Sequence, residues 1–137
     1  MADADFPVTI YHNPDCGTSR NALAMIRAAG YQPTVVEYLK SGWDRNLLKS
    51  LMAQAQAKPR DFLREKGTPA ADLGLMAGDV SDDRIVDAML AHPILVNRPI
   101  VATPKGVKLC RPSEAVLDLL ERRPDSFTKE DGEIVRS

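Results

Sequence analysis

A cysteine-containing loop between a predicted strand and a predicted helix constrains the fold more than any other stretch of the sequence. Residues 6–11 are rich in β-forming side chains, and residues 22–29 carry apolar residues at helical spacing. Cys16 lies in the segment that joins them. Because Thr18 or Ser19 can cap the helix with a side-chain oxygen, we expect Cys16 in the loop just before the first helical turn.

This placement of Cys16 favours a reactive thiol. Unpaired backbone N–H groups and the positive end of the helix dipole stabilise an anion at a helix start, whether a thiolate or a bound oxyanion. A fall in pKa from about 8.5 to about 6.5 would raise the thiolate fraction at pH 7 from roughly 3% to roughly 75%. The loop therefore predicts a nucleophile, with the alternative that Cys16 is an inert small residue lining a turn.

A second predicted strand follows the helix. Residues 33–38 carry β-forming side chains, and Gly30 before them is a typical helix C-cap. Two strands joined by a helix lie parallel with a right-handed crossover, which places Cys16 at the C-terminal edge of the sheet. In open α/β sheets, binding sites form at that edge.

The middle of the chain, about 44–92, is predicted to be a helical insertion. One helix is expected after the capping residue Asp44, a short one begins near Pro59, and another opens at Ser81. Arg64 falls at the end of the short helix. On its own, this arginine is interpreted as a solvated side chain that favours a helix C-terminus.

A β-hairpin is predicted next, with strands at 99–102 and 107–110. Its turn has proline second and glycine fourth, as type I turns favour. Arg98 directly precedes the hairpin and Arg111 directly follows it, so their guanidiniums should be neighbours. Two like charges placed together repel, and this favours an anion bound between them.

The remaining features of the sequence limit the class of protein to which it can belong. A last helix is expected from Pro112, and the strongly charged residues 121–137 are typical of a mobile tail. The length of 137 residues predicts one domain, 1–137. A net charge of −1 argues against proteins that coat nucleic acid or an anionic membrane.

Histidine and cysteine do not cluster at metal-ligand spacing, so no metal site is expected. No apolar run is long enough to cross a bilayer, and the acidic start lacks the apolar core of a signal peptide. A cytoplasmic location, where thiols stay reduced, is therefore expected.

Several runs of sequence closely resemble the glutaredoxin-coupled bacterial arsenate reductases. These runs are 11–14, 16–21, 92–101 and 109–114, together with the tail motif 127–133. The resemblance covers nearly the whole chain and implies an α/β, thioredoxin-like fold. In this fold a four-stranded mixed sheet carries a helical insertion between its βαβ half and its C-terminal hairpin and helix.

The resemblance also implies roles for individual residues, and it alone singles out Arg64. Thioredoxin-like folds place a cis-proline before the hairpin strand, which predicts a cis Arg98–Pro99 bond. By position, the catalytic cysteine is Cys16, the oxyanion-binding residues are Arg64, Arg98 and Arg111, and the residues supporting the thiolate are His12 and Ser19.

The family reaction uses no tightly bound cofactor. Cys16 would attack arsenate to form a thiol–As(V) adduct, and glutathione, the co-substrate, would attack that adduct. Arsenic falls to As(III), glutaredoxin removes the glutathione, and arsenite leaves. Ser19 stands where a C-x-x-C motif keeps its second cysteine, and strand alternation puts Cys110 on the face opposite Leu109. An external thiol is therefore expected.

Three alternatives compete with this interpretation, and the sequence disfavours two of them. A superfamily regulator that binds RNA polymerase and senses oxidants should carry a C-x-x-C pair, which is absent at Cys16. Phosphatase-like arsenate reductases need five residues between cysteine and arginine, whereas three residues separate Cys16 from Arg20. A glutathione-dependent thiol oxidoreductase acting on another substrate stays open.

Overall fold

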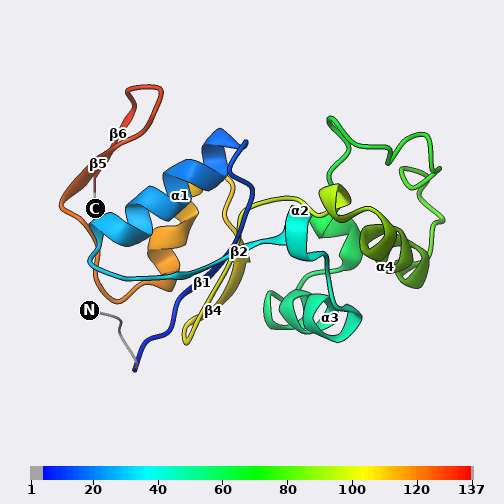
Figure 1. Cartoon of the computed structure of the whole chain (residues 1–137), viewed down its shortest axis with the longest axis horizontal. Helices are drawn as coiled ribbons and strands as arrows, with labels where there is room; N and C mark the ends of the chain where they lie inside the picture. The colour runs from blue at the N-terminus through cyan, green and yellow to red at the C-terminus, as the bar shows by residue number, and fades with distance from the viewer. Residues whose placement is uncertain (1–4, 137) are drawn as a thin grey trace. The chain divides into compact units, whose positions relative to one another are not determined.

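The computed structural model describes residues 5–136, which divide into two compact units. The sheet unit comprises residues 5–37 and 98–136, and the helical unit comprises residues 38–97. Figure 1 shows the elements of both units coloured along the chain. The helical unit is wider than the predicted insertion of about 44–92 because it also includes the turn of helix at Tyr38–Ser41 and the segment up to Asn97.

The sheet unit contains the predicted four-stranded mixed sheet. Its strands are β1 (Thr9–His12), β2 (Thr34–Glu37), β3 (Ile100–Thr103) and β4 (Gly106–Leu109). They lie in the order β2-β1-β3-β4, with β1 parallel to β2 and β3 antiparallel to both β1 and β4. The βαβ half and the hairpin are therefore confirmed, and they meet where β1 pairs with β3.

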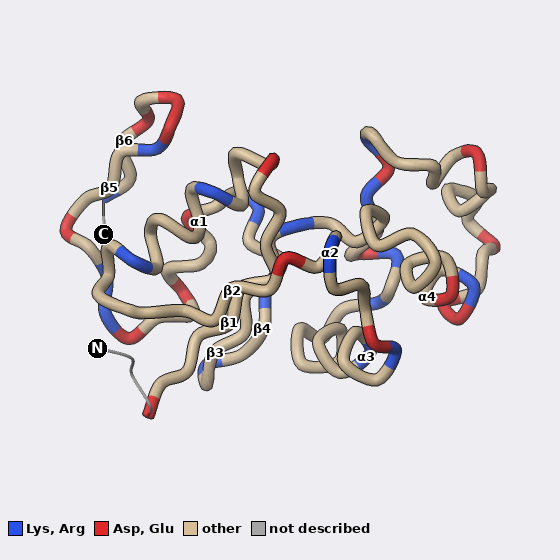
Figure 2. Tube along the Cα trace, viewed as in Figure 1, with Lys and Arg blue, Asp and Glu red and all other residues tan. Residues whose placement is uncertain are grey.

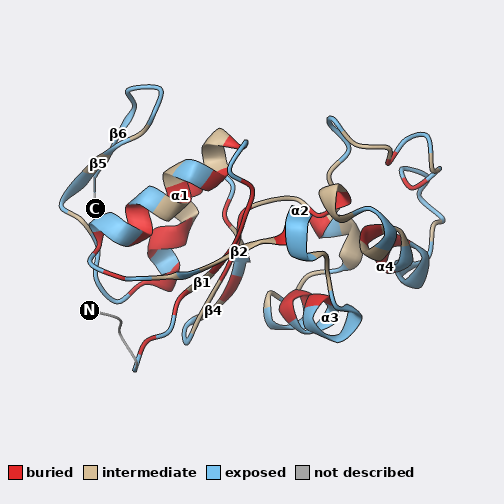
Figure 3. Ribbon diagram, in the orientation of Figure 1, coloured by how far each residue is buried: buried red, intermediate tan, exposed pale blue. Residues whose placement is uncertain are grey.

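One helix and one 3₁₀ segment pack on a face of this sheet and complete the core of the unit. Helix α1 (Gly17–Ala28) buries one stripe of side chains, and Figure 3 colours these buried positions red. It ends in a Schellman arrangement: Gly30 has φ 97°, and the Tyr31 N–H reaches the Ile26 carbonyl at 3.3 Å. The predicted last helix is the 3₁₀ segment η3 (Ser113–Leu119).

The charged C-terminal segment differs from the mobile tail expected over 121–137. Within the described residues it forms a hairpin of β5 (Ser126–Thr128) and β6 (Ile134–Arg136). Its apolar side chains Phe127 and Val135 pack against the core. The sequence did not indicate this packing, because most residues around them are charged or polar. Figure 1 shows this hairpin, coloured red, beside α1.

The helical unit contains α2 (Tyr38–Ser41), α3 (Arg45–Gln54), η1 (Pro59–Phe62), α4 (Asp82–Ala91) and η2 (Pro93–Leu95). Both predicted caps are present. The Asp44 carboxylate accepts the Leu47 N–H at 3.0 Å, and the Ser81 hydroxyl accepts the Arg84 N–H at 3.2 Å. Over residues 5–136, none of the helices combines the length and apolar character needed to span a membrane.

Candidate active site

Cys16 occupies the N-cap position of α1, at the start predicted for the helix. Its N–H donates to the Asn13 carbonyl at 3.1 Å, and the residue is only 8% exposed. The predicted cap by Thr18 or Ser19 is wrong, because α1 already begins at Gly17 and both residues lie in its first turn. The Ser19 N–H instead donates a hydrogen bond to the Cys16 sulfur.

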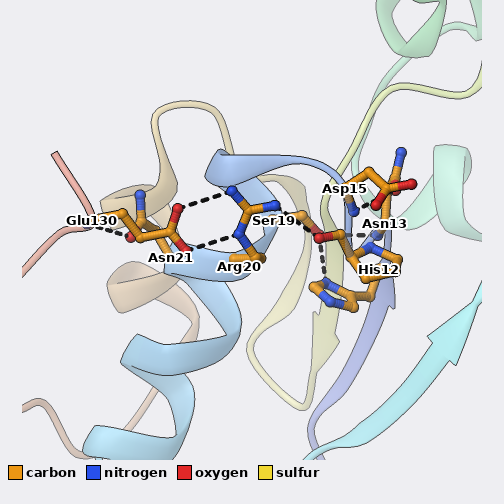
Figure 4. Close-up of polar contacts among 8 residues, drawn as sticks. His12, Asn13, Asp15, Ser19, Arg20, Asn21 and Glu130 are labelled. Atoms are coloured by element: carbon orange, nitrogen blue, oxygen red, sulfur yellow. Dashed lines mark hydrogen bonds and ion pairs between the residues drawn. The ribbon is translucent and has the colours of Figure 1, made fainter.

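The Ser19 side chain has a different partner, and Figure 4 shows it pointing back toward β1. Alternation along β1 puts His12 on the same face as Ile10, the face that α1 covers. There His12 Nδ1 lies 2.6 Å from Ser19 Oγ, which also accepts the Asn13 N–H at 3.1 Å. Burial lowers the pKa of His12, so its imidazole is neutral at neutral pH.

The two hairpin arginines meet at the same cysteine. Arg98 precedes β3 and Arg111 follows β4, and the Arg111 guanidinium donates to the Arg98 carbonyl at 2.8 Å. Arg111 Nη1 also lies 3.8 Å from Cys16 Sγ. The Arg98–Pro99 bond is cis, as predicted, and the Arg111–Pro112 bond is cis as well. The prediction that these arginines are neighbours is confirmed.

The pKa of Cys16 reflects a competition between burial and positive charge. Burial raises the pKa, but hydrogen bonds from the Arg98 guanidinium, the Ser19 N–H and the Arg111 guanidinium outweigh it and lower the pKa to about 7. About half of the sulfur is then thiolate at neutral pH. The helix start lowers the pKa of Cys16 through the Ser19 N–H, as the sequence suggested, while Arg98 lowers it more.

Cys110 lies in a contrasting environment. It is fully buried within the apolar core of the sheet unit, on the face opposite Leu109 as alternation predicts. Burial raises the pKa of its thiol to about 12. The two cysteines are both free thiols, and at neutral pH only Cys16 has an appreciable thiolate population.

Arg64 belongs to the helical unit, unlike Cys16, Arg98 and Arg111, which belong to the sheet unit. Its N–H donates to the Leu95 carbonyl at 2.8 Å, its Nε to the Lys66 carbonyl at 3.1 Å, and its Nη1 to Asn97 Oδ1 at 3.3 Å. Asn97 directly precedes Arg98 in the sequence. The side chain is therefore anchored, in contrast to the solvated arginine that the sequence alone suggested.

Sequence reasoning missed other residues that shape the cysteine loop. Asn13 is buried, and its side chain accepts the Asp15 N–H at 2.9 Å. The Asn-Pro-Asp pattern could have indicated this role, because it is typical of Asx-turns, in which the Asn side chain accepts a backbone N–H two residues later. Arg20 and Glu130 form an ion pair beside the loop (Figure 4), and no local pattern links residues so distant in sequence.

The donor set fits an oxyanion rather than a metal ion. Among residues 5–136, no group of three or more histidine, cysteine or acidic side chains could hold a metal. Guanidiniums, in contrast, present paired N–H donors that match the oxygens of a tetrahedral anion. A thiolate flanked by two such groups is equipped to attack the central atom of a bound oxyanion.

Comparisons with known proteins agree with this chemistry. The arsenate reductase ArsI2 of Synechocystis sp. is 59% identical over 129 residues, covering 93% of this chain and 92% of the relative. An arsenate reductase of Escherichia coli is 54% identical, covering 93% and 92%. The solved arsenate reductase from Vibrio cholerae has a TM-score of 0.79 and 37% identity, covering 84% of this chain and 98% of that one.

The family signature spans the parts of the chain that build the site. It matches residues 11–119, from the end of β1 through the cysteine loop and the hairpin to the end of η3. With this match and relatives more than half identical over most of their length, the chain belongs to the ArsC family.

Proposed function

We propose that this protein is an arsenate reductase that converts arsenate to arsenite in arsenic detoxification. One observation carries the proposal: the Cys16 thiol, with its pKa lowered to about 7, receives hydrogen bonds from both Arg98 and Arg111. The relatives that share most of the chain are named arsenate reductases, which supports arsenate as the oxyanion.

The first step is nucleophilic attack by Cys16 on arsenic. A sulfur–arsenic bond forms, and one arsenate oxygen takes up two protons and leaves as water, giving a thiol–As(V) adduct. The guanidiniums of Arg98 and Arg111 reduce the repulsion between thiolate and dianion and orient the oxygens. His12 and Ser19 support the loop that presents the sulfur.

The second step requires two electrons from thiols outside the chain. Ser19 stands where a neighbouring resolving cysteine would be, and Cys110 is buried with its pKa raised to about 12. We infer glutathione as co-substrate and glutaredoxin as partner: two thiols become one disulfide, and arsenic falls from As(V) to As(III). This chemistry requires no tightly bound cofactor and suits the cytoplasm, where thiols stay reduced.

Arg64 is proposed as the third oxyanion-binding residue. The helical unit anchors its side chain through Asn97, the residue before Arg98 in the sequence. A third guanidinium would add charge for a substrate that carries about two negative charges at neutral pH. The family resemblance of the sequence supports this role.

The reactivity of Cys16 gives the first prediction. In Cys110→Ser, the rate of alkylation by iodoacetamide should rise with pH around a midpoint of about 7, because the thiolate is the reacting form. In Cys16→Ser, labelling of the folded protein should be negligible. A midpoint of about 8.5 or higher, the value of a free thiol, would contradict the proposed activation.

A coupled assay tests the reaction itself. With glutathione, glutathione reductase and glutaredoxin present, wild-type protein should oxidise NADPH only when arsenate is added. Cys16→Ser should be inactive, because a hydroxyl of much higher pKa is no nucleophile at neutral pH. Cys110→Ser should keep most activity. Arsenate-independent turnover would favour a thiol oxidoreductase of another substrate, and turnover without glutathione would contradict the external-thiol mechanism.

The geometry of Arg98 gives a third prediction. Arg98→Lys should lower kcat/KM for arsenate by about tenfold or more, because an ammonium cannot reproduce paired planar donors. The matched control is Arg123→Lys, at an exposed arginine paired with Asp118, which should leave kcat/KM unchanged. Equal activity in both variants would mean that charge alone suffices at this position.

The role of Arg64 is tested within its own unit. Arg64→Ala should raise KM for arsenate by about tenfold, since one charge-assisted contact to the substrate is lost. Arg45→Ala, which removes a surface ion pair with Asp87 in the same unit, is the control. If Arg64→Ala kept the wild-type KM and only lowered the melting temperature, Arg64 would be only structural.

A further inference from the structure

The C-terminal segment 121–136, called here the strap, contacts both ends of α1. At the C-terminal end of α1, the Arg122 side chain donates to the Gly30 carbonyl at 3.1 Å, and its guanidinium lies 4.3 Å from the centre of the Tyr31 ring. Tyr31 in turn accepts the Arg122 N–H at 2.9 Å. The strap is thus fastened at the end of the helix far from Cys16.

At the N-terminal end, the strap reaches the cysteine loop through one arginine. Arg20 Nε and Nη2 donate to the two oxygens of Glu130 at 2.8 and 3.0 Å, while Arg20 Nη1 donates to the Pro14 carbonyl at 2.8 Å. The Glu130 N–H donates to Asn21 Oδ1 at 3.1 Å (Figure 4). Glu130 therefore fixes the guanidinium that holds the loop two residues before Cys16.

The same turn of the strap also contacts the segment that follows Arg111. Lys129, whose side chain is only 9% exposed, lies with Nζ 2.7 Å from Glu114 Oε1 in η3 and 3.2 Å from Glu133 Oε1. Figure 2 shows residues of both charges along the turn between β5 and β6. Neighbouring residues of one turn thus hold the loop of Cys16 and the helical segment next to Arg111.

We propose that the strap is a positioning element of the active site, in which Glu130 acts through Arg20 and Pro14 to hold Cys16 in its reactive geometry. This inference rests on the proposed function where arsenate turnover is concerned, and not where the reactivity of Cys16 is concerned. Glu130 is a positioning residue, since no described contact joins it to the sulfur.

Stability alone gives a weak reason for this ion pair. Arg20 and Glu130 are 44% and 49% exposed, and exposed pairs contribute little to folding. The geometry is more specific than simple charge pairing, because all three nitrogens of the Arg20 guanidinium donate hydrogen bonds and one of them holds the Pro14 carbonyl. A planar guanidinium fixed by a bidentate carboxylate has little freedom to leave that carbonyl.

Electrostatics and positioning predict opposite results when Glu130 loses its charge. Removing a carboxylate near Cys16 leaves Arg20 uncompensated, which would lower the pKa of the thiol and favour arsenate binding. Loosening the loop instead weakens the hydrogen bonds that Cys16 receives from Arg98, Ser19 and Arg111, which raises the pKa. The sign of the change therefore separates the two effects.

The test uses Glu130→Gln, Arg20→Gln and the double variant, each in the full-length Cys110→Ser protein. The rate of alkylation by iodoacetamide is measured as a function of pH. The coupled assay gives kcat and KM for arsenate, and circular dichroism gives the melting temperature. We expect the alkylation midpoint to rise by about half a pH unit and kcat to fall about tenfold. The double variant should be no worse than either single one, because the two residues act as a unit.

The matched control is Asp118→Asn, which breaks exposed ion pairs with Lys108 and Arg123 in the same unit. It should leave both the midpoint and kcat unchanged. A Glu130→Gln protein with an unchanged or lower midpoint and wild-type kcat would overturn the proposal, whatever its melting temperature. If that variant does not fold, Asn21→Ala, which removes one contact to the same turn, must show a smaller rise of the midpoint.

The two readouts separate this proposal from the proposed function. Alkylation of Cys16 needs no arsenate, so its midpoint tests the strap even if the wild-type protein reduces no arsenate. Absence of wild-type turnover with a raised midpoint in Glu130→Gln would overturn the proposed function alone. Normal turnover in both proteins with equal midpoints would overturn the strap alone.

Discussion

The balance between burial and positive charge at the sulfur of Cys16 is the interaction on which the site depends. A thiol that is 8% exposed would ordinarily be less acidic than a free one, and the nearby donors reverse that effect. These donors come from separate places: Ser19 from the first turn of α1, and Arg98 and Arg111 from the two ends of the hairpin. The fold brings these three donors together around the sulfur of Cys16.

The pairing of β1 with β3 achieves this. It joins the N-terminal βαβ half to a hairpin that lies some ninety positions later, with Tyr11 opposite Ile100. His12, the last residue of β1, leads into the cysteine loop, and Arg98 lies just before the start of β3, at the same edge of the sheet. Residues remote in sequence thus share one edge of the sheet, where α/β folds form binding sites.

Local patterns in the sequence were sufficient for much of this arrangement. Hydrophobic periodicity predicted α1, the turn chemistry predicted the hairpin, and together they predicted that Arg98 and Arg111 are neighbours. Side-chain competition explains the misassigned cap: Ser19 is a good capping residue, but its hydroxyl is engaged by His12 and Asn13. The role proposed for Arg64 could not be predicted from the local sequence, since a lone arginine at a helix end gives no signal for oxyanion binding.

The strap illustrates why the remaining contacts escape sequence reasoning. Residues 121–136 have the charge of a solvated tail, yet Lys129 is nearly buried because Glu114 and Glu133 neutralise it. Glu130 meets Arg20 across 110 positions of sequence, and no periodicity or turn preference encodes such a pair. Charge that looks dispersed along the sequence is partly matched in space: Glu130 pairs with Arg20, and Lys129 pairs with Glu114 and Glu133. Arg20 also donates to the Pro14 carbonyl in the loop of Cys16, and this contact is why we propose that the strap positions the active site.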